Sequence, residues 1–303
     1  MTEKIPDLYN NDSVIVSFEL FPPKTKSGFE ALSTQIDDLI SCNPSFITCT
    51  YGAGGSTRHK TLDVLEHVKQ AYPTIPVASH LTCVGSTVDE LKAFLAELKT
   101  SNINTIVALR GDPPLGETNF TPPPGGLSYA NELVALIKNE FPEFGILVAG
   151  YPEKHPEAPS MEVDLQNLKR KIDAGGEAII TQLFFNNEDF YRFRDRCVKA
   201  GITVPVVPGI LPVINLNQIK RFTALCGSRL TDKLRRRLEA HGDDEEGQYS
   251  VGIYYAARQV EELVENGGVP GVHFYVLNRS RAVGHICRAL NLSTPSHRYN
   301  HGR

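Results

Sequence analysis

The 303-residue chain lacks the features that mark membrane, secreted or nucleic-acid-binding proteins. No apolar run approaches the roughly 20 residues that cross a bilayer, and the polar stretch from Met1 to Asn11 has no apolar signal-peptide core. The formal net charge is only −4, which gives no reason to expect nucleic acid or an anionic membrane surface as a partner. A chain of this size buries a large core without needing covalent staples.

Cysteine is sparse and shows no pairing pattern. No Cys-x-x-Cys pair occurs, and most cysteines lie in expected helices or strands, where a free thiol behaves as a small buried hydrophobe. The simplest interpretation is a reduced, cytoplasmic protein without a structural zinc site. The six cysteines are Cys42, Cys49, Cys83, Cys197, Cys226 and Cys287.

Several catalytic signatures are also missing. The first strand–helix connection reads Phe21-Pro22-Pro23-Lys24 and lacks the Gly-x-Gly-x-x-Gly dinucleotide fingerprint. No Gly-x-Ser-x-Gly elbow occurs, no expected strand ends in a lysine placed for a Schiff base, and no His-x-His follows the first strand. A metal-dependent hydrolase that uses His80, Asp112 and His155 as ligands stays open as one alternative.

The chain does contain eight short β-rich runs that alternate with longer amphipathic runs. This alternation predicts parallel strands with right-handed crossovers, either in an open doubly wound sheet or in a closed barrel. Eight units in about 300 residues, without the glycine fingerprint, favour a (β/α)8 TIM barrel. The expected strands are 14–21, 45–51, 76–83, 105–111, 145–151, 178–185, 204–211 and 271–277. The expected helices are 28–42, 57–71, 87–101, 128–140, 161–175, 188–200, 216–226, 248–266 and 280–290.

The whole chain, 1–303, is expected to form one catalytic barrel domain. Residues 1–12 and 292–303 are expected to be flexible tails. An extra helical insertion is expected before the last strand. Within it, residues 228–247 carry charge runs that are typical of exposed, solvated surface.

A carboxylate in the first expected strand is out of place in its surroundings. Because side chains alternate along a strand, Ser17 and Glu19 share one face, while Val16, Phe18 and Leu20 share the other. A carboxylate in such a strand costs free energy unless it is paired or used. Two prolines then end the strand and fix where Glu19 lies. Glu19 is therefore either a catalytic group or a barrel-lining carboxylate paired with an arginine.

Seven of the eight expected strands end in hydrogen-bonding or titratable side chains, whereas the seventh has the apolar end 208–212. Active sites of such barrels lie at the carboxyl ends of the strands. We therefore predict a polar active-site mouth at this end of the barrel. The polar groups are Glu19, Thr50, Tyr51, His80, Thr82, Arg110, Asp112, Tyr151, His155, Thr181, Gln182, Tyr275 and Arg279.

Two further features have alternative interpretations. Asp164, Asn167 and Lys171 lie at i, i+3 and i+7 of one expected helix, and so share a face beside its apolar stripe. That face is either a solvated flank or a grip for the ribose and phosphates of a cofactor. The glycine-rich stretch 52–56 is either a phosphate cradle or only a turn.

In this order and spacing, the motifs resemble bacterial methylenetetrahydrofolate reductase, an FAD-containing (β/α)8 barrel. The resemblance runs from about Val16 to Leu290. It is carried by Val16–Pro23, Thr50-Tyr51-Gly52-Ala53, His80-Leu81-Thr82-Cys83, Val107–Asp112, Tyr151–Ala158, Asp164–Gly175, Ile180–Phe185, Pro208–Pro212 and Phe274–Arg279.

The resemblance implies that 5,10-methylenetetrahydrofolate is reduced to 5-methyltetrahydrofolate. NADH or NADPH would reduce non-covalently bound FAD in one half-reaction, and folate would oxidise it in the other. The product would supply methyl groups for methionine synthesis. The resemblance further implies a homo-oligomer, dimeric or tetrameric, of the form without the regulatory domain of eukaryotic relatives.

The resemblance also implies roles for individual residues. Glu19 matches the general acid, Asp112 the carboxylate beside the flavin and pterin, and Gln182 a contact to the ligand stacked on the flavin. Folate-contacting positions are matched by Gln218, Phe222, Tyr275 and Arg279. FAD-contacting positions are matched by Thr50, Tyr51, Ala53, His80, Arg110, Gly111, Asp112, Tyr129, Ala130, Tyr151, His155, Asp164, Asn167, Arg170 and Lys171.

The chain departs from enteric members of that family near the ligand cleft. Leu183 and Leu216 each stand in place of a phenylalanine, and the stretch 53–59 reads Ala-Gly-Gly-Ser-Thr-Arg-His. A folate-binding barrel of a methyl-transfer complex, without redox activity of its own, is the remaining alternative. The helix Asp164–Lys171 and the turn Arg110-Gly111-Asp112 argue against it, because such a module does not need them.

Overall fold

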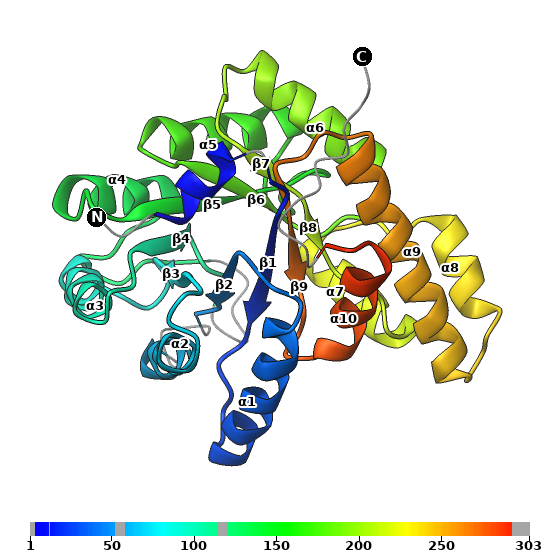
Figure 1. Ribbon diagram of the computed structural model, residues 1–303. Helices are drawn as coiled ribbons and strands as arrows, with labels where there is room; N and C mark the ends of the chain where they lie inside the picture. Colours follow the sequence, from blue (N-terminus) through cyan, green and yellow to red (C-terminus); the bar gives the residue numbers. More distant parts are fainter. Residues whose placement is uncertain (1–3, 12, 52–57, 114–119, 293–303) are drawn as a thin grey trace.

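A closed barrel of parallel strands forms the centre of the molecule, and the helices surround it (Figure 1). The computed structural model describes residues 4–11, 13–51, 58–113 and 120–292. Every strand pair is parallel, in the order β7-β6-β5-β4-β3-β2-β1-β9-β8, so the predicted TIM-barrel fold is confirmed. The strands are β1 Ile15–Leu20, β2 Phe46–Cys49, β3 Val77–Thr82, β4 Thr105–Leu109, β5 Gly145–Gly150, β6 Ala178–Thr181, β7 Val206–Val207, β8 Gly209–Ile210 and β9 Gly271–Tyr275.

The seventh barrel strand is split at a proline. The sequence predicts one strand over 204–211, but β7 pairs only with β6 and β8 pairs only with β9. Pro208 lies between them and has no N–H to donate, while its carbonyl accepts a hydrogen bond from the N–H of His273 at 3.0 Å. The two short strands thus occupy one barrel position, which leaves the eight positions expected.

The predicted helices are all present. They begin at side-chain caps where the sequence provides them. Thr87 accepts a hydrogen bond from the N–H of Glu90, and the Glu90 carboxylate reaches back, which is the predicted capping box. The helices are α1 Lys26–Ile40, α2 Arg58–Ala71, α3 Val88–Thr100, α4 Ala130–Glu140, α5 Met161–Asp173, α6 Asn187–Lys199, α7 Leu216–Cys226, α8 Asp232–Glu239, α9 Glu245–Glu265 and α10 Ser280–Ala289.

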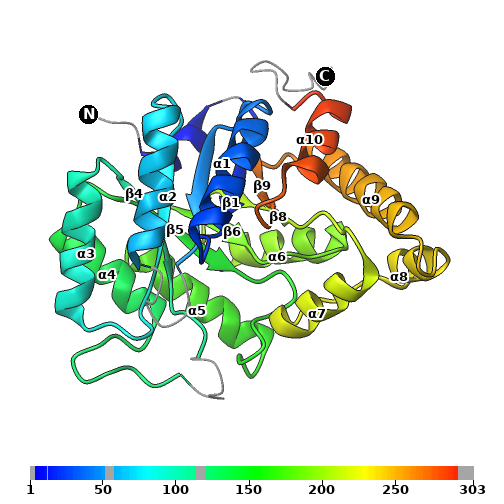
Figure 2. The ribbon, with the colours of Figure 1, turned by 90° about the horizontal axis from the view of Figure 1, so that it is seen from below.

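The insertion before the last strand is a packed helix, α8, and not only exposed surface. Figures 1 and 2 both place α8 at the outer edge beside α9. Its charged residues face solvent as expected, but Leu234 and Leu238, at i and i+4, are fully buried against Ile219 and its apolar neighbours. An apolar pair on one face is enough to anchor a short helix that is otherwise charged.

The N-terminal segment closes the bottom of the barrel, so the expectation of a tail over 1–12 is wrong for residues 5–10. These residues form a 3-10 helix, η1 Ile5–Asn10. Ile5 and Tyr9 are buried against the apolar beginnings of the strands, and the Tyr9 ring meets Phe46 edge-on at 6.3 Å. Burying these two side chains stabilises the segment through the hydrophobic effect. Residues 1–3, 12 and 293–303 lie outside the described residues.

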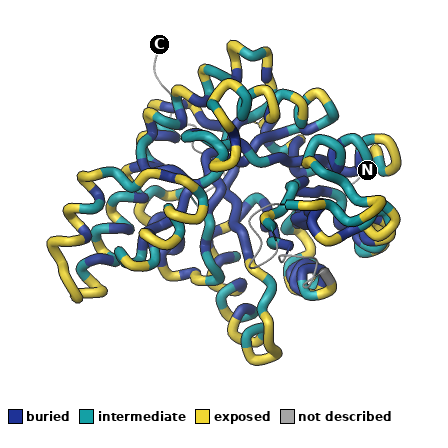
Figure 3. The backbone as a smooth tube through the Cα atoms, turned by 180° about the vertical axis from the view of Figure 1, so that it is seen from behind, coloured by how far each residue is buried: buried dark blue, intermediate teal, exposed yellow. Residues whose placement is uncertain are grey.

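Burial follows the barrel geometry. Figure 3 shows buried backbone along the central strands and exposed backbone on the outer helix faces. Inside the barrel, apolar side chains fill the N-terminal end, and polar side chains follow toward the C-terminal end. None of the described helices combines the length and apolar character needed to cross a bilayer.

Candidate active site

The polar layer of the barrel begins on two neighbouring strands. In the register of β1 with β9, Ser17 lies opposite His273 and Glu19 lies opposite Tyr275. Glu19 also lies opposite Thr48 of β2. Because side chains alternate along a strand, these positions all face the barrel interior. Only 7% of Glu19 is exposed, so its carboxylate is held almost out of water.

Two imidazoles face the Glu19 carboxylate. His80 Nε2 lies 3.4 Å from Oε2 of Glu19, and His273 Nε2 lies 3.9 Å from the same oxygen. His80 Nε2 also lies 3.3 Å from the hydroxyl of Thr48. The alternative that Glu19 pairs with an arginine is wrong for the part of the chain that the structure describes, since its ion-pairing neighbours there are histidines.

His80 is uncharged near neutral pH. Burial lowers the pKa of His80 to about 4. The Glu19 charge opposes this effect, and His273 adds a smaller lowering. Desolvation disfavours the imidazolium, and one nearby carboxylate does not compensate for it. At His80, therefore, the Glu19 carboxylate faces a neutral polar group.

Tyr275 closes the layer on the other side of the carboxylate. Its hydroxyl donates a hydrogen bond to the carbonyl of Thr181 at 2.6 Å, and its ring meets His273 edge-on at 5.5 Å. Burial raises the pKa of Tyr275, and the charges of Glu19 and Tyr151 raise it further. Tyr275 is thus close enough to Glu19 and to Tyr151 to respond to the charge of each. It lies between the barrel interior and the end of β5.

A second polar group gathers at the ends of β4 and β5. Arg110 donates two hydrogen bonds to the Glu157 carboxylate, at 2.5 and 2.7 Å, and its guanidinium lies over the Phe120 ring at 5.5 Å. The rings of Tyr151 and His155 meet at 4.7 Å. Burial, followed by the Arg110 charge, lowers the pKa of His155.

Two side chains of helix α5 pack against this second polar group. Asp164 accepts a hydrogen bond from the backbone N–H of His155 at 3.0 Å. Lys171 donates to the carbonyl of Ala149, and burial lowers the pKa of Lys171 to about 8 although the Asp164 charge opposes this. A half-buried ammonium whose pKa is lowered is characteristic of a functional site. Asp164 and Lys171 therefore belong to this polar group and do not form a solvated flank.

The other predicted site residues lie around the same end of the barrel. Asp112 is exposed, yet its charge raises the pKa of Tyr151, so it lies close to the second group. Gly111 has a φ of +88°, and a Cβ there would meet Val84 at 2.6 Å, so only glycine fits this turn. Arg170 donates to Asn167 at 2.9 Å on the exposed part of α5. Tyr129 caps α4 with 59% of its surface exposed, and Ala130 begins that helix.

The structure separates some predicted residues from the two polar groups. The ring of Tyr51 packs against Phe94 of α3 in the outer core. The carbonyl of Thr50 accepts a hydrogen bond from the hydroxyl of Thr61 at 2.8 Å. Arg279 is exposed at the start of α10. Ala53 lies outside the described residues.

The folate-contacting candidates of α7 lie in and beside an apolar cluster. Phe222 and Leu216 are partly buried against Leu183 and Ile219 in this cluster, whereas Gln218 lies one turn into the helix after the Asn215 cap. The Gln182 side chain accepts a hydrogen bond from the N–H of Leu183 at 2.9 Å.

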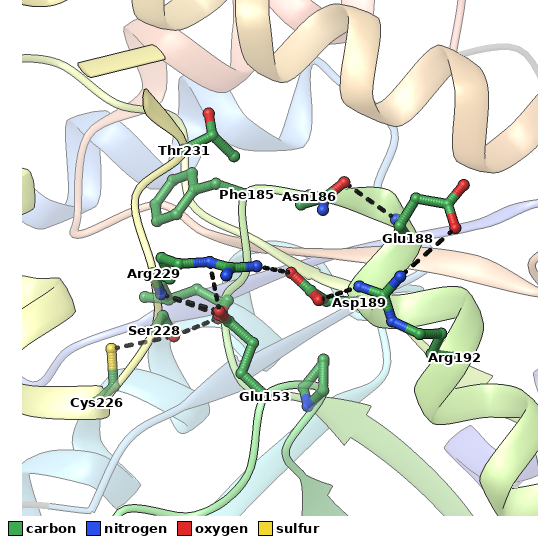
Figure 4. Close-up of polar contacts among 12 residues, drawn as sticks. Glu153, Phe185, Asn186, Glu188, Asp189, Arg192, Cys226, Ser228, Arg229 and Thr231 are labelled. Carbon is green, nitrogen blue, oxygen red and sulfur yellow. Dashed lines mark hydrogen bonds and ion pairs between the residues drawn. The ribbon is translucent and has the colours of Figure 1, made fainter. Parts of the chain in front are cut away.

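A polar clamp holds the connection after α7 against the ends of β5 and β6 (Figure 4). Glu153 accepts hydrogen bonds from the backbone N–H of Arg229 at 3.0 and 3.1 Å, and Asp189 lies 3.4 Å from the Arg229 guanidinium. The hydroxyl of Ser228 donates to the carbonyl of Leu183 at 2.6 Å. The clamp thus fixes the chain next to Gln182, and the sequence analysis does not identify it.

His273 and Thr48 are also missing from the sequence prediction. His273 shares its strand face with Tyr275, two residues later, as Ser17 does with Glu19. The alternation of side chains that places Ser17 beside Glu19 on β1 therefore identifies His273 on β9 as well. Thr48 would have followed from the same rule on β2.

Comparison with known proteins decides the family. A family model described as methylenetetrahydrofolate reductase matches residues 4–291. The chain belongs to the methylenetetrahydrofolate reductase family. This family is one of oxidoreductases, and the resemblance noted from the motifs is confirmed.

Bacterial and plant members of the reductase family align over nearly all of this chain. The 5,10-methylenetetrahydrofolate reductase of Escherichia coli strain K12 is 42% identical over 277 residues, which cover 91% of this chain and 90% of that protein. The Buchnera aphidicola protein of the same name is 38% identical over 96% of both chains. "Methylenetetrahydrofolate reductase (NADH) 1" of Arabidopsis thaliana is 34% identical over 96% of this chain and 51% of its own length.

A solved structure shares the fold of this reductase-family chain. It is an uncharacterized protein from Clostridium thermocellum that binds two copies of 5-methyl-5,6,7,8-tetrahydrofolic acid. The superposition has a TM-score of 0.64 at 16% identity and covers 95% of this chain and 97% of that one. At this identity the likeness supports the fold alone.

The metal-hydrolase alternative finds no support in the geometry. Residues 4–11, 13–51, 58–113 and 120–292 contain no group of three His, Cys, Asp or Glu side chains arranged to hold a metal ion. His80 contacts Glu19 inside the barrel, whereas His155 lies with Tyr151 in the second polar group. The three candidate ligands, His80, Asp112 and His155, therefore do not form one metal site.

Proposed function

We propose that this protein reduces 5,10-methylenetetrahydrofolate to 5-methyltetrahydrofolate, with NADH or NADPH as the electron donor and FAD as a bound cofactor. The main observation behind the proposal is the position of Glu19. Its carboxylate is almost fully buried at the polar end of the barrel, between His80 and His273. Family membership supports the reaction class, and the name of the Arabidopsis relative supports a nicotinamide donor for that protein.

The second polar group fits a flavin dinucleotide. Arg110, Arg170 and Lys171 supply positive charge of the kind that a diphosphate requires, and the half-buried ammonium of Lys171 gains most from an anionic partner. The exposed ring of Tyr129 offers an aromatic face, and Gly111 permits close backbone approach. When bound, the flavin would accept a hydride from NAD(P)H and deliver it to folate.

Glu19 would supply the proton that the folate half-reaction needs. Opening the five-membered ring of the substrate to an iminium requires a proton on the departing nitrogen, and Glu19 is the acidic side chain at the centre of the barrel mouth. The carbon–nitrogen bond breaks, its electron pair stays on the nitrogen, and that nitrogen takes the carboxyl proton. Because His80 is neutral near pH 7, it places no positive charge beside the Glu19 carboxyl group.

Asp112 and the residues of α7 would orient the ligands. Asp112 would place negative charge beside the flavin ring and the pterin. Gln182, Gln218, Phe222, Tyr275 and Arg279 would contact folate, and Gln182 would also contact the nicotinamide, which occupies the same place in the other half-reaction. The polar clamp around Arg229 supports this by fixing the chain next to Gln182.

A visible absorption spectrum of the purified protein tests the proposal most directly. The expected result is a flavin spectrum that bleaches when NADH or NADPH is added without oxygen and returns when methylenetetrahydrofolate follows. A colourless protein that binds folate and cannot be reconstituted with FAD would overturn the proposal in favour of a folate-binding module.

A further inference from the structure

The backbone ladder between β1 and β9 ends at the level of Glu19. Its last pair joins Glu19 to Tyr275. Beyond this pair, the chain after β1 continues through Phe21 into two prolines, which have no N–H to donate. Phe21 is therefore the last residue before the prolines whose backbone can both donate and accept a hydrogen bond.

The side chain of Asn278 bonds to both of these backbone groups. The N–H of Phe21 donates to Oδ1 of Asn278 at 2.8 Å, and Nδ2 of Asn278 donates to the carbonyl of Phe21 at 2.8 Å. A carboxamide has the same donor and acceptor groups as a peptide, and this orientation of the amide satisfies both contacts. The Asn278 side chain therefore extends the contact between β1 and β9 past the last ladder pair.

The chain turns sharply after β9, and this turn carries Asn278. Leu277 has a φ of +50° and Asn278 a φ of +56°. The N–H of Arg279 donates to the carbonyl of Val276 at 2.9 Å, which closes a tight turn around these two residues. Asparagine adopts left-handed backbone more readily than most residues, whereas leucine is strained there. A strained turn persists where its surroundings hold it, and such turns cluster at functional sites.

The other end of this turn is fixed to helix α1. Ser280, the first residue of α10, donates from its backbone N–H to the side-chain oxygen of Gln35 at 2.9 Å. Its hydroxyl lies 2.9 Å from the Asp38 carboxylate. Helices α1 and α10 pack side by side (Figure 1). Arg279 is thus an exposed residue between two anchored neighbours, Asn278 and Ser280.

The two edges of β1 are held differently beyond Glu19. On the β2 side, the backbone N–H of Thr50 donates to the carbonyl of Leu20 at 2.9 Å. On the β9 side, the contact past Tyr275 comes from the Asn278 side chain. A single substitution can therefore remove the contact on the β9 side and leave the backbone ladder intact.

We propose that Asn278 is a positioning residue, which holds the loop after Glu19 against the turn before Arg279. This inference rests on the proposed function, because it takes Glu19 as the acid. Phe21 lies two residues after Glu19, so a shift of its backbone displaces the carboxyl group. A proton donor has to lie within hydrogen-bond distance of the nitrogen that it protonates, so this displacement slows the transfer. Asn278 gives up no proton and acts only through its neighbours.

Two substitutions separate the amide of Asn278 from the shape of the turn. Asn278→Gly removes the amide and keeps the turn, because glycine adopts left-handed backbone at no steric cost. Asn278→Asp keeps the acceptor for the Phe21 N–H but loses the donor to the Phe21 carbonyl. Asn102→Gly is the matched control, because Asn102 also has a left-handed φ, +54°, but is exposed between α3 and β4.

Stopped-flow kinetics of each half-reaction give the first readout. In Asn278→Gly, the rate constant of the folate half-reaction at saturating folate should fall by about 10-fold, as expected when a general acid is misplaced. Flavin reduction by saturating NADH should change by less than about 2-fold, because Glu19 donates no proton in that step. Asn278→Asp should lose about 3-fold in the folate step, and the Asn102→Gly control should match wild type.

Amide hydrogen exchange measured by NMR gives a readout that does not depend on activity. Removal of its acceptor in Asn278→Gly should speed exchange of the Phe21 N–H by about 10-fold or more, while Asn102→Gly leaves it unchanged. If Asn278→Gly does not fold, Asn278→Asp gives the same kinetic comparison with the smaller loss stated.

Three results would overturn the inference: a folate rate within about 2-fold of wild type in Asn278→Gly, equal slowing of both half-reactions, or unchanged exchange of the Phe21 N–H. A wild-type rate in Asn278→Gly would show that the turn alone matters and the amide does not. Wild-type protein that shows no flavin or folate turnover would instead refute the proposed function, and the exchange measurement would still decide the contact.

Discussion

Tyr275 and Thr181 meet across the split strand of the barrel, where the Tyr275 hydroxyl donates to the Thr181 carbonyl at 2.6 Å. The contact exists because Gly209 has no side chain. A Cβ at Gly209 would lie 2.1 Å from the Thr181 carbonyl oxygen and 2.7 Å from the Tyr275 ring. The amide of Gly209 also donates to the Thr181 hydroxyl at 2.9 Å. Gly209, Thr181 and Tyr275 therefore join the strands on either side of the split.

Gly209→Ala should therefore destabilise the fold. The added methyl group meets the Thr181 backbone on one side and the partly buried Tyr275 ring on the other, which predicts a loss of about 2 kcal/mol or more in the free energy of unfolding. Urea denaturation measures it. Gly284→Ala is the control, since its Cβ would meet only the flexible end of Arg288 at 3.3 Å. Equal stability of the two variants would contradict the steric argument.

Glu19→Gln should separate the two half-reactions. Glutamine keeps the shape of the side chain but has no acidic proton to give, so the folate half-reaction should slow by about 100-fold or more. Reduction of the flavin by NADH should continue near the wild-type rate. Stopped-flow absorbance of each half-reaction measures this, and similar slowing of both would show that Glu19 is structural or shared.

Lys171→Met should weaken FAD binding. Removing a charge-assisted contact to a phosphate predicts a rise in the FAD dissociation constant of about 10- to 100-fold. Because the pKa of Lys171 is lowered to about 8, wild-type affinity should fall as the pH rises through that value, whereas the affinity of the variant should show no such fall. Flavin fluorescence titration at several pH values measures both effects.

Lys169→Met is the matched control for Lys171. Lys169 lies on the same helix, is half-buried and pairs with Asp173 on another face. Its substitution should leave FAD affinity and its pH dependence unchanged. A parallel loss in both variants would point to the stability of α5 and not to a phosphate contact.

His80 should make the fold sensitive to mild acid. Its pKa is about 4 in the folded state against 6.5 as the ordinary value, so the unfolded chain binds the proton more readily. Stability from this group is complete above pH 6.5 and is lost as the pH falls toward 4, by about 2–3 kcal/mol. His80→Asn should lose correspondingly less over that window in urea denaturation. Identical pH profiles for the two proteins would exclude a buried neutral His80.

The polar clamp gives a comparison between a buried and an exposed contact. Ser228→Ala leaves the buried Leu183 carbonyl without its 2.6 Å donor and should cost about 1–2 kcal/mol of unfolding free energy. Arg229→Ala removes a side chain that is 68% exposed while the backbone N–H to Glu153 remains, so it should cost less than about 1 kcal/mol. Thermal or urea unfolding ranks the two variants, and the reverse order would refute this account of the clamp.

Most of the fold could be predicted because local periodicity and strand ends are properties of neighbouring residues. The split at Pro208 was not predicted, because the change of partner from β6 to β9 depends on distant strands. The charge runs of 228–247 predict a helical but exposed insertion, because the charges of α8 outnumber Leu234 and Leu238, although two buried leucines suffice to anchor it. Residues 5–10 have too few apolar groups to show from sequence that they close the barrel.

The candidate site could be predicted where it lies at strand ends, as Glu19, His80 and Tyr275 do. His273 lies two residues earlier on its strand than Tyr275, below the rim, so a search of strand ends passes over it. The partial burial of Lys171 cannot be predicted from helical periodicity, because it depends on how α5 packs against β5. Asp112 and Arg279 also follow strand ends, and the structure leaves both exposed.

The 3-10 helix η1 limits the routes by which a ligand can reach the barrel interior. Ile5 and Tyr9 are buried at the lower end of the barrel and fill it beneath the layer of Glu19. A ligand that reaches this carboxylate has to enter and leave through the upper end. Two ligands that bind at the same place must therefore bind one after the other, each through the upper end. The shape of the barrel imposes this order of binding and release, whatever the chemistry.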